Sequence, residues 1–280
     1  MTIYKSETGA RLLRERYLEA LTAWPVPHEQ VRVPTPEGET FVVVSGPENA
    51  PPLVLLHGSG SNSAEWAPRI RELGQFRVYA VDIIGEPGLS AEARPPLASD
   101  RYAVWLDAVL DHFALPKAAF LTSSFGGWLA LDHAIRRPER VAALALRCPI
   151  GLGPMKKGFV VKAVLLALLG ERGRRRSVAS TIGEPETSPI VEHQLLVSAN
   201  YRYRTGPFPV FDDAALAGLT MPVYAVAGAE DAMVDSATTK RRLERAGATV
   251  DLVPGTGHYI PGSADLDFLT RAAANGDFTA

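Results

Sequence analysis

From residue 52 onward, short apolar segments alternate with segments that have helical spacing, and this alternation limits the fold more than any other feature. The segments that predict strands are PPLVLLHG, FRVYAVDI, KAAFLTS, VAALALRC, PVYAVAG and TVDLVPG. The segments that predict helices are AEWAPRIREL, DRYAVWLDAVLDHFAL, GGWLALDHAIRR, ATTKRRLERAG and ADLDFLTRAAA. Strands and helices in alternation are typical of parallel βαβ units. The sequence therefore predicts an α/β fold with a mostly parallel sheet flanked by helices.

One region precedes this alternation, and a second region interrupts it. Residues 5–22 predict a helix that the segment WPVP ends, followed by a hairpin of two strands, HEQVRVPT and ETFVVVSG. Residues 150–210 hold helical patterns, the basic run ERGRRR and a proline-rich exit, TGPFPVFDD. We interpret the chain as a single domain, residues 1–280, with residues 150–210 inserted in it as a helical cap. The insertion follows the end of a predicted strand, over the edge where α/β sheets bind ligands.

The longest apolar run, FVVKAVLLALL at residues 159–169, lies within this insertion. It contains a lysine and is shorter than the roughly 20 residues that cross a bilayer, so the sequence predicts no membrane span. Its apolar side chains recur at helical spacing, so one face of the helix can line an apolar pocket. Leu165 and Leu169 are therefore candidate substrate-binding residues, and a lipid-facing helix is the alternative.

The composition argues against several classes of function. A net charge of −2 across 280 residues indicates no electrostatic grip on nucleic acid or on an anionic membrane. Cys148 is the only cysteine, so no internal disulfide can form, which suits a reducing compartment and predicts a cytoplasmic protein. We expect Cys148 itself to be a small buried hydrophobic residue. Since no phosphate loop, dinucleotide fingerprint or zinc-ligand cluster occurs in the sequence, we expect no cofactor and no metal.

The segment LTSSFGGWLA joins a predicted strand to a predicted helix and contains two adjacent serines. A nucleophile elbow needs small residues two positions before and two positions after its nucleophile, because the tight turn brings chain segments into contact. With Ser123 at the centre, these positions hold a leucine and a phenylalanine, which are too large. With Ser124 at the centre they hold Thr122 and Gly126, so Ser124 is the candidate nucleophile. Thr122 stands where glycine is usual, and a serine-capped helix is the alternative interpretation.

A serine hydroxyl needs a base before it becomes nucleophilic. His258 lies in the glycine-rich segment GTGHYIP after the last predicted strand, and Glu230 and Asp231 follow the strand before it. Serine, acid and histidine in this order, each after a successive strand, are expected of a Ser-His-Asp triad on an α/β sheet. Because the carboxyl ends of parallel strands share one edge of a sheet, we expect these residues to meet there.

Acyl transfer also needs hydrogen-bond donors for a developing negative charge. The segment LLHGSGSN follows an earlier buried strand, and its glycine-rich backbone can direct N–H groups at an oxyanion. We assign the backbone N–H groups of Ser59 and Phe125 as these donors. The alternative for HGSG is an ordinary turn between a strand and a helix.

The segments LLHGSG, VDIIGEPGLS, SSFGGWLAL, AGAED and GTGH stand in the order of the α/β-hydrolase superfamily, which the chain resembles from about residue 30 to its end. The resemblance implies the α/β-hydrolase fold, with Ser124 as nucleophile and His258 as base. It also favours Asp231 as the orienting acid, because that acid usually lies three residues after the glycine that ends the strand, here Gly228. The segment VDIIGEPGLS is one residue longer than the common form. Together with WPVP and FDDAALAGLTMPV, it is similar to a bacterial carboxylesterase-like subgroup.

A serine nucleophile argues against the dehalogenases and epoxide hydrolases of the superfamily, which use an aspartate at this position. We expect a carboxylic-ester hydrolase that cleaves a small or medium apolar ester through an acyl-enzyme. One alternative is a receptor-like or binding member with little turnover, in which Thr122 distorts the elbow and misplaces Ser124. The others are different triad chemistries: thioester hydrolysis, carbon–carbon bond hydrolysis, perhydrolysis or lyase chemistry. For Asp82, Gly85 and Gly88 we expect a structural role in a turn.

Overall fold

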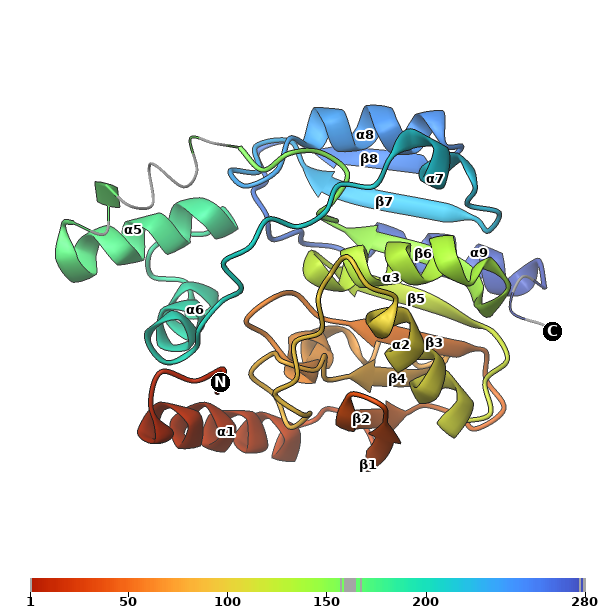
Figure 1. Cartoon of the computed structure of the whole chain (residues 1–280), viewed down its shortest axis with the longest axis horizontal. Helices are drawn as coiled ribbons and strands as arrows, with labels where there is room; N and C mark the ends of the chain where they lie inside the picture. Colours follow the sequence, from red (N-terminus) through yellow and green to blue (C-terminus); the bar gives the residue numbers. More distant parts are fainter. Residues whose placement is uncertain (1, 157, 159–164, 167, 277, 279–280) are drawn as a thin grey trace.

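The computed structural model describes residues 2–156, 158, 165–166, 168–276 and 278 (Figure 1). An eight-stranded sheet in the order β1-β2-β4-β3-β5-β6-β7-β8 forms its centre. The strands are β1 (His28–Thr35), β2 (Gly38–Ser45), β3 (Pro52–Leu56), β4 (Arg77–Val81), β5 (Ala118–Ser123), β6 (Val141–Arg147), β7 (Val223–Gly228) and β8 (Thr249–Val253). β2 pairs antiparallel with β1 and β4, and every pair from β4 to β8 is parallel. The predicted mostly parallel α/β sheet is confirmed.

Helices cover both faces of this sheet, because its central strands are apolar on both sides. In β5, Ala118 and Phe120 face one hydrophobic cluster, while Ala119 and Leu121 face the other. The first cluster lies under α2 (Arg101–His112), α3 (Phe125–Arg136) and α8 (Ser236–Arg245). The second lies under α1 (Glu7–Thr22), the 3₁₀ helix η1 (Ser63–Arg69) and α9 (Ala264–Ala274). Two short helices, η2 (Pro138–Arg140) and α7 (Asp213–Ala217), precede β6 and β7.

One predicted helix has a different form. The segment AEWAPRIREL has α-helical spacing, but the structure holds the 3₁₀ helix η1 over Ser63–Arg69, followed by turns. Pro68 lies inside this segment and has no backbone N–H to donate, so a continuous α-helical ladder cannot form there. Trp66 is buried and packs on the sheet from the shorter element.

The segment between β6 and β7 carries two helices, α5 (Gly170–Ile182) and α6 (Pro189–Asn200), which lie apart from the helices that flank the sheet (Figure 1). The basic run ERGRRR falls in α5, where Arg175 pairs with Glu192 of α6 at 2.5 Å. α6 packs against the N-terminal region through a small cluster of Ile3, Tyr4, Leu13, Val197 and Tyr201. Most of the apolar run FVVKAVLLALL, residues 159–164 and 167, lies outside the described residues. Among the helices in the described part, none is long and apolar enough to cross a membrane.

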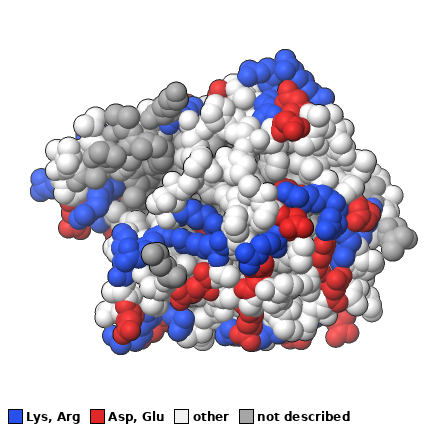
Figure 2. All heavy atoms as spheres, viewed as in Figure 1, with Lys and Arg blue, Asp and Glu red and all other residues white. Residues whose placement is uncertain are grey.

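Charged side chains of both signs lie close together on the face shown in Figure 2. A band of Lys and Arg crosses this face, and Asp and Glu side chains lie directly beside it. This mixture agrees with the net charge of −2. The basic band is therefore flanked by acidic side chains on this face.

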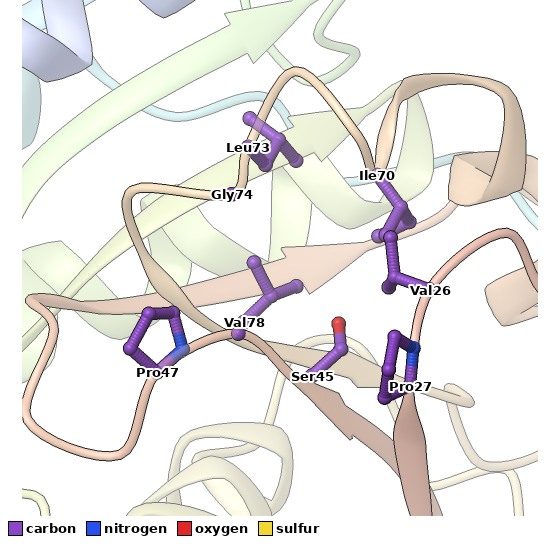
Figure 3. A pocket seen from close by; sticks show the side chains of 9 residues that line it. Val26, Pro27, Ser45, Pro47, Ile70, Leu73, Gly74 and Val78 are labelled. Carbon is purple, nitrogen blue, oxygen red and sulfur yellow. The ribbon is translucent and has the colours of Figure 1, made fainter.

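A small cavity of about 260 Å³ lies at the edge of the sheet where β2 ends and β4 begins (Figure 3). Its lining is mostly apolar and comes from Val26, Pro27, Ser45, Gly46, Pro47, Ile70, Leu73, Gly74 and Val78. Val78 belongs to the amino-terminal half of β4. The cavity is therefore at the end of the sheet opposite to the carboxyl ends of the parallel strands.

Candidate active site

The carboxyl ends of three parallel strands bring Ser124, Asp231 and His258 together. Ser124 directly follows β5, Asp231 lies three residues after β7, and His258 lies five residues after β8. Ser124 and His258 are 134 positions apart in the sequence, yet their side chains are hydrogen-bonded. The parallel direction of the strands makes this possible, since all three turns lie at one edge of the sheet.

Ser124 occupies a sharp turn between β5 and α3, with φ 48° and ψ −105°. A positive φ is rare for a residue with a side chain and stores strain at the turn. The close approach of neighbouring chain segments explains the need for glycine at Gly126, where a Cβ atom would lie 2.2 Å from the Leu56 carbonyl oxygen. Thr122 is buried, and its hydroxyl donates to the Ala145 carbonyl oxygen at 3.4 Å. The residue that departs from the usual pattern is therefore accommodated without displacing Ser124.

An unbroken chain of hydrogen bonds joins the three side chains. The Ser124 hydroxyl lies 2.9 Å from His258 Nε2, and His258 Nδ1 lies 2.6 Å from Asp231 Oδ2. An ionised carboxylate only accepts hydrogen bonds, so Nδ1 carries the proton and the Nε2 lone pair faces the serine hydroxyl. The other carboxylate oxygen, Asp231 Oδ1, accepts from the backbone N–H groups of Met233 at 2.7 Å and Val234 at 3.2 Å. This arrangement can remove a proton from Ser124.

The two adjacent acids, Glu230 and Asp231, have different surroundings in the structure. Burial is the largest influence on Asp231 and acts to raise its pKa, but the hydrogen bond and charge of His258 and two backbone N–H groups together outweigh it. The pKa of Asp231 therefore lies below its ordinary value, and the carboxylate is ionised beside the imidazole. Glu230 is exposed and accepts from the Gly255 N–H at 3.1 Å. Of these two acids, only Asp231 is hydrogen-bonded to His258.

The two assigned oxyanion donors belong to segments that lie next to Ser124. A Cβ atom at Gly58 would lie 3.6 Å from Ser124 Cβ, so the HGSG loop runs directly past the elbow. Within the described residues, the backbone N–H groups of Ser59 and Phe125 have no hydrogen-bond acceptor. Both groups are therefore free to donate to a ligand.

His57 fixes the direction of this loop, a role that the sequence reasoning did not identify. The Ile83 N–H donates to His57 Nε2 at 3.0 Å, so Nδ1 carries the proton and donates to the Gly58 carbonyl oxygen at 2.8 Å. The Gly58 carbonyl and the Ser59 N–H belong to one trans peptide and point in opposite directions. By holding the carbonyl, His57 sets where the Ser59 N–H points.

Arg147 was also missed, and it anchors the loop that carries His258. Its guanidinium donates to the carbonyl oxygens of Ile260 and Gly262 and to Asp265 Oδ2, the last at 2.5 Å. Asp265 is buried and also accepts two hydrogen bonds from Arg69, at 2.7 and 2.8 Å. A charged residue at the end of a buried strand is the only sequence signal for this contact. The histidine loop is thereby tied to β6, beside the serine turn.

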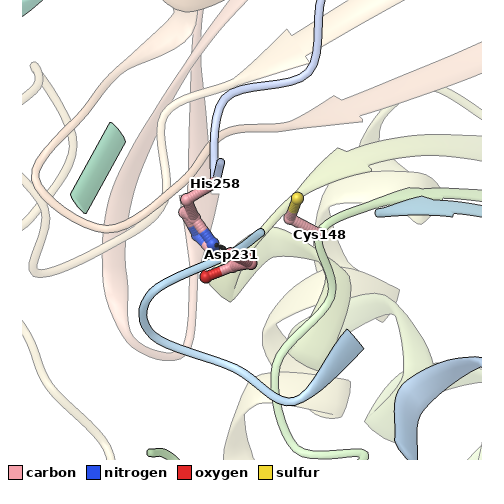
Figure 4. A group of neighbouring side chains, drawn as sticks. All are labelled: Cys148, Asp231 and His258. Atoms are coloured by element: carbon pink, nitrogen blue, oxygen red, sulfur yellow. Dashed lines mark hydrogen bonds and ion pairs between the residues drawn. The ribbon is translucent and has the colours of Figure 1, made fainter. Parts of the chain in front are cut away.

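Cys148 lies next to the acid and the histidine (Figure 4). A thiol sulfur, a carboxylate oxygen and an imidazole nitrogen, from Cys148, Asp231 and His258, all lie within 4.8 Å of one another. Burial raises the pKa of Cys148 to about 12, so the thiol keeps its proton. Because metal binding needs a thiolate and a free imidazole nitrogen, and both His258 nitrogens are engaged, this geometry suits proton transfer better than metal binding. The prediction that Cys148 is a buried residue is confirmed.

The structure supports the turn role of Asp82, and it shows that the two leucines of the insertion are exposed. Asp82 is buried and accepts from Tyr17, from both the N–H and the hydroxyl of Ser63, and from the Leu89 N–H. Leu165 and Leu169 are 59% and 68% exposed, and their binding role stays a prediction.

Comparisons with known proteins agree with the fold. The model of a family described as "Alpha/beta hydrolase family" matches residues 53–271. The chain is 29% identical to carboxylesterase YbfK of Bacillus subtilis (strain 168) over 273 residues, which cover 91% of this chain and 89% of that protein. It is 39% identical to a second protein of that strain, named uncharacterized carboxylesterase nap, over 145 residues, 51% of this chain and 48% of the relative. The crystal structure of a naproxen esterase from Bacillus subtilis has a TM-score of 0.77 and 27% identity, and the match covers 97% of this chain and 96% of that one.

Proposed function

Since this chain belongs to the alpha/beta hydrolase family, we propose that it is a serine hydrolase that cleaves small or medium apolar carboxylic esters. The observation that carries the proposal is the hydrogen-bonded series from Asp231 through His258 to Ser124, with the serine on a strained elbow. The similar proteins named carboxylesterases support the choice of an ester as substrate.

In the first half of the proposed reaction, Ser124 Oγ attacks the carbonyl carbon of the ester. His258 Nε2 takes the hydroxyl proton as the new C–O bond forms, and the carbonyl oxygen becomes an oxyanion. The N–H groups of Ser59 and Phe125 donate to this oxyanion, which stabilises the tetrahedral intermediate more than the planar ester. The intermediate then collapses, the bond to the alcohol oxygen breaks, and His258 returns its proton to the leaving alcohol.

The second half repeats these steps with water. His258 Nε2 takes a proton from a water molecule, the resulting hydroxide attacks the acyl-enzyme carbonyl, and the proton is given back to Ser124 as the acid leaves. Asp231 holds the imidazole in the tautomer that keeps Nε2 free, and its negative charge stabilises the imidazolium that forms twice in the cycle.

We assign choice of substrate to the insertion at residues 150–210, acting as a cap on a single domain. Its helices lie outside the layers that flank the sheet, and Leu165 and Leu169 offer exposed apolar surface to a ligand. The cytoplasmic location stays a prediction that rests on the single cysteine.

Labelling with a fluorophosphonate tests the chemistry, because this reagent reacts with an activated serine. We expect the wild type to take up one label, Ser124→Ala to take up none, and Ser123→Ala to be labelled. Wild-type protein that takes up no label would instead favour the receptor-like alternative. A panel of matched esters and thioesters, measured as kcat/KM, then separates ester hydrolysis from the other triad chemistries. Faster turnover of thioesters across the panel would contradict the proposed substrate class.

A further inference from the structure

We propose that Glu86 and Tyr201 form a connection through which the insertion between β6 and β7 holds the oxyanion loop in its active position. Glu86 lies after β4 in the segment VDIIGEPGLS, and Tyr201 directly follows α6 of the insertion. Glu86 is thus a positioning residue, which acts through the backbone of Ser59 and Gly60. The inference rests on the proposed function, because it assigns these residues to the same oxyanion hole.

One carboxylate oxygen of Glu86 accepts hydrogen bonds from both the loop and the insertion. Glu86 Oε2 accepts from the Gly60 N–H at 2.6 Å, from the Ser59 hydroxyl at 3.2 Å and from the Tyr201 hydroxyl at 2.7 Å. Hydrogen bonds to an ionised acceptor are stronger than neutral ones. The loop is therefore held on both sides of the Ser59 N–H, by His57 at the preceding carbonyl and by Glu86 at the following N–H.

The insertion also packs on the loop directly. Gly60 has φ +73°, and a Cβ atom there would lie 2.6 Å from ring atoms of Tyr203, so the ring covers the loop backbone. The rings of Tyr201 and Tyr203 meet edge to face with centroids 5.0 Å apart. Arg94 lies over the Tyr201 ring at 5.1 Å. The Tyr201 hydroxyl therefore has little freedom to leave Glu86.

The direction of the bond between these two residues follows from burial. Tyr201 is fully buried, and burial together with the nearby Glu86 carboxylate raises its pKa far above the ordinary value. The hydroxyl thus keeps its proton and donates to the carboxylate. Its second neighbour, the Gly85 carbonyl oxygen at 3.1 Å, is farther away.

Glu86 is also buried without an ion-pair partner among the described residues, which argues against a role in stability alone. It is 1% exposed. No Lys, Arg or His of the described residues forms an ion pair with it, and its Oε1 has no hydrogen-bond partner among them. A buried carboxylate without an ion pair costs free energy of folding. The carboxylate instead acts as a fixed hydrogen-bond acceptor for the loop that carries Ser59 and Gly60.

The test compares Glu86→Ala, Glu86→Gln and Tyr201→Phe with wild type, with kcat expressed per fluorophosphonate-titrated site. We expect Glu86→Ala to lower kcat by about 10- to 100-fold, less than the loss of a whole oxyanion donor, with KM nearly unchanged. Glu86→Gln keeps an acceptor oxygen and should retain most of the wild-type kcat. Tyr201→Phe should lower kcat with KM nearly unchanged, and adding it to Glu86→Ala should cause little further loss, because both act on one network.

Tyr203→Phe is the matched control, since it keeps the ring on Gly60 and removes a hydroxyl that bonds to Gln194 instead of Glu86. Its kcat should stay near the wild-type value. If Glu86→Ala fails to fold, Tyr201→Phe carries the test alone, and an unchanged kcat there overturns the proposal. Equal kcat per titrated site in all variants, with only the melting temperature altered, also overturns it. A wild type that neither hydrolyses esters nor takes up label overturns the proposed function, and this inference with it.

Discussion

At the scale of single residues, the backbone of Ser124 is the most constrained feature of the site. Its φ of 48° lies in a region that costs roughly 1–3 kcal/mol for a residue with a side chain. The Ser124 N–H donates to the Arg147 carbonyl oxygen at 2.9 Å, and Gly126 allows the Leu56 carbonyl to come close. These contacts hold the hydroxyl toward His258.

Substitution of the three side chains should separate their roles. We expect Ser124→Ala and His258→Ala to lower kcat by on the order of a million-fold, and Asp231→Asn by about ten-thousand-fold, because the acid only orients and stabilises the base. Ser123→Ala is the control and should have a far smaller effect, since Ser123 occupies the variable position of the turn. Steady-state kinetics on one apolar ester check these values. Near-wild-type hydrolysis by a clean preparation of Ser124→Ala would refute the assignment.

At the scale of elements, ion pairs to a buried aspartate connect three segments that also share one hydrophobic cluster. Asp265 at the start of α9 accepts from Arg147 at the end of β6 and from Arg69 of η1. Burial, the largest influence, acts to raise the pKa of Asp265, but the hydrogen bonds and charges of the two arginines outweigh it and lower that pKa. The pair therefore contributes to stability only while Asp265 is ionised.

The pH dependence of this contribution follows from the sign of the shift. A pKa that is lower in the folded state means that the unfolded chain binds the proton more readily. The contribution is therefore complete above the ordinary aspartate pKa of about 4 and is lost as the pH falls through the lower folded value. We expect Asp265→Asn to cost about 3–5 kcal/mol at pH 7, and less as the pH falls below about 4. Urea unfolding of both proteins from pH 7 to pH 3 measures this difference, and a constant difference would contradict it.

The strand β2 offers a stability prediction that is independent of the site. Ser45 is buried at the end of this strand and lines the cavity in Figure 3, and its hydroxyl has no hydrogen-bond partner among the described residues. Replacing it with valine removes an unpaired polar group and adds a β-branched side chain, so we expect the free energy of unfolding to rise by about 1 kcal/mol. Thr40→Val in the same strand is the matched control. It should destabilise, because the Thr40 hydroxyl accepts from Trp105 Nε1 at 2.8 Å. Thermal unfolding measures the stability of both variants. Equal changes in Ser45→Val and Thr40→Val would contradict the prediction.

At the scale of the whole molecule, the sheet carries the candidate reacting groups, and the insertion between β6 and β7 makes hydrogen bonds to residues around them. Hydrogen bonds to Glu86 and Asp231 reach the site from both ends of the insertion, through Tyr201 and through Lys156, whose Nζ donates to the Asp231 carbonyl oxygen at 2.6 Å. Changes in the insertion are therefore expected to alter activity without removing the triad.

Chain-length preference should depend on the leucines of the insertion. We expect Leu165→Ala and Leu169→Ala to shift the preferred acyl length, with each methylene worth roughly 1–3 kcal/mol in kcat/KM, while Ser124 is still fully labelled by fluorophosphonate. Leu18→Ala, at a half-exposed position of α1, is the control. The measurement is kcat/KM across a series of ester chain lengths. A parallel decline for all esters would show that these leucines only hold the insertion together.

The sequence alone was sufficient for the α/β fold and for placing Ser124, His258 and an acid at the ends of strands, while the catalytic roles of these residues stay predictions. These features depend on local patterns: apolar runs that alternate with helices, and small residues around a turn. Pro68 is equally visible in the sequence, and its missing N–H, rather than the apolar spacing, decides the form of η1.

Only the tertiary structure decided which groups meet, because hydrogen bonds between distant segments leave no periodic pattern. Asp231 and Glu230 are adjacent in sequence, yet the turn directs one carboxylate to His258 and leaves the other to accept from Gly255. His57, Glu86 and Arg147 likewise give no local signal of their roles. Each acts on a segment that lies next to it only after the strands have paired, so its contribution is defined by the folded chain.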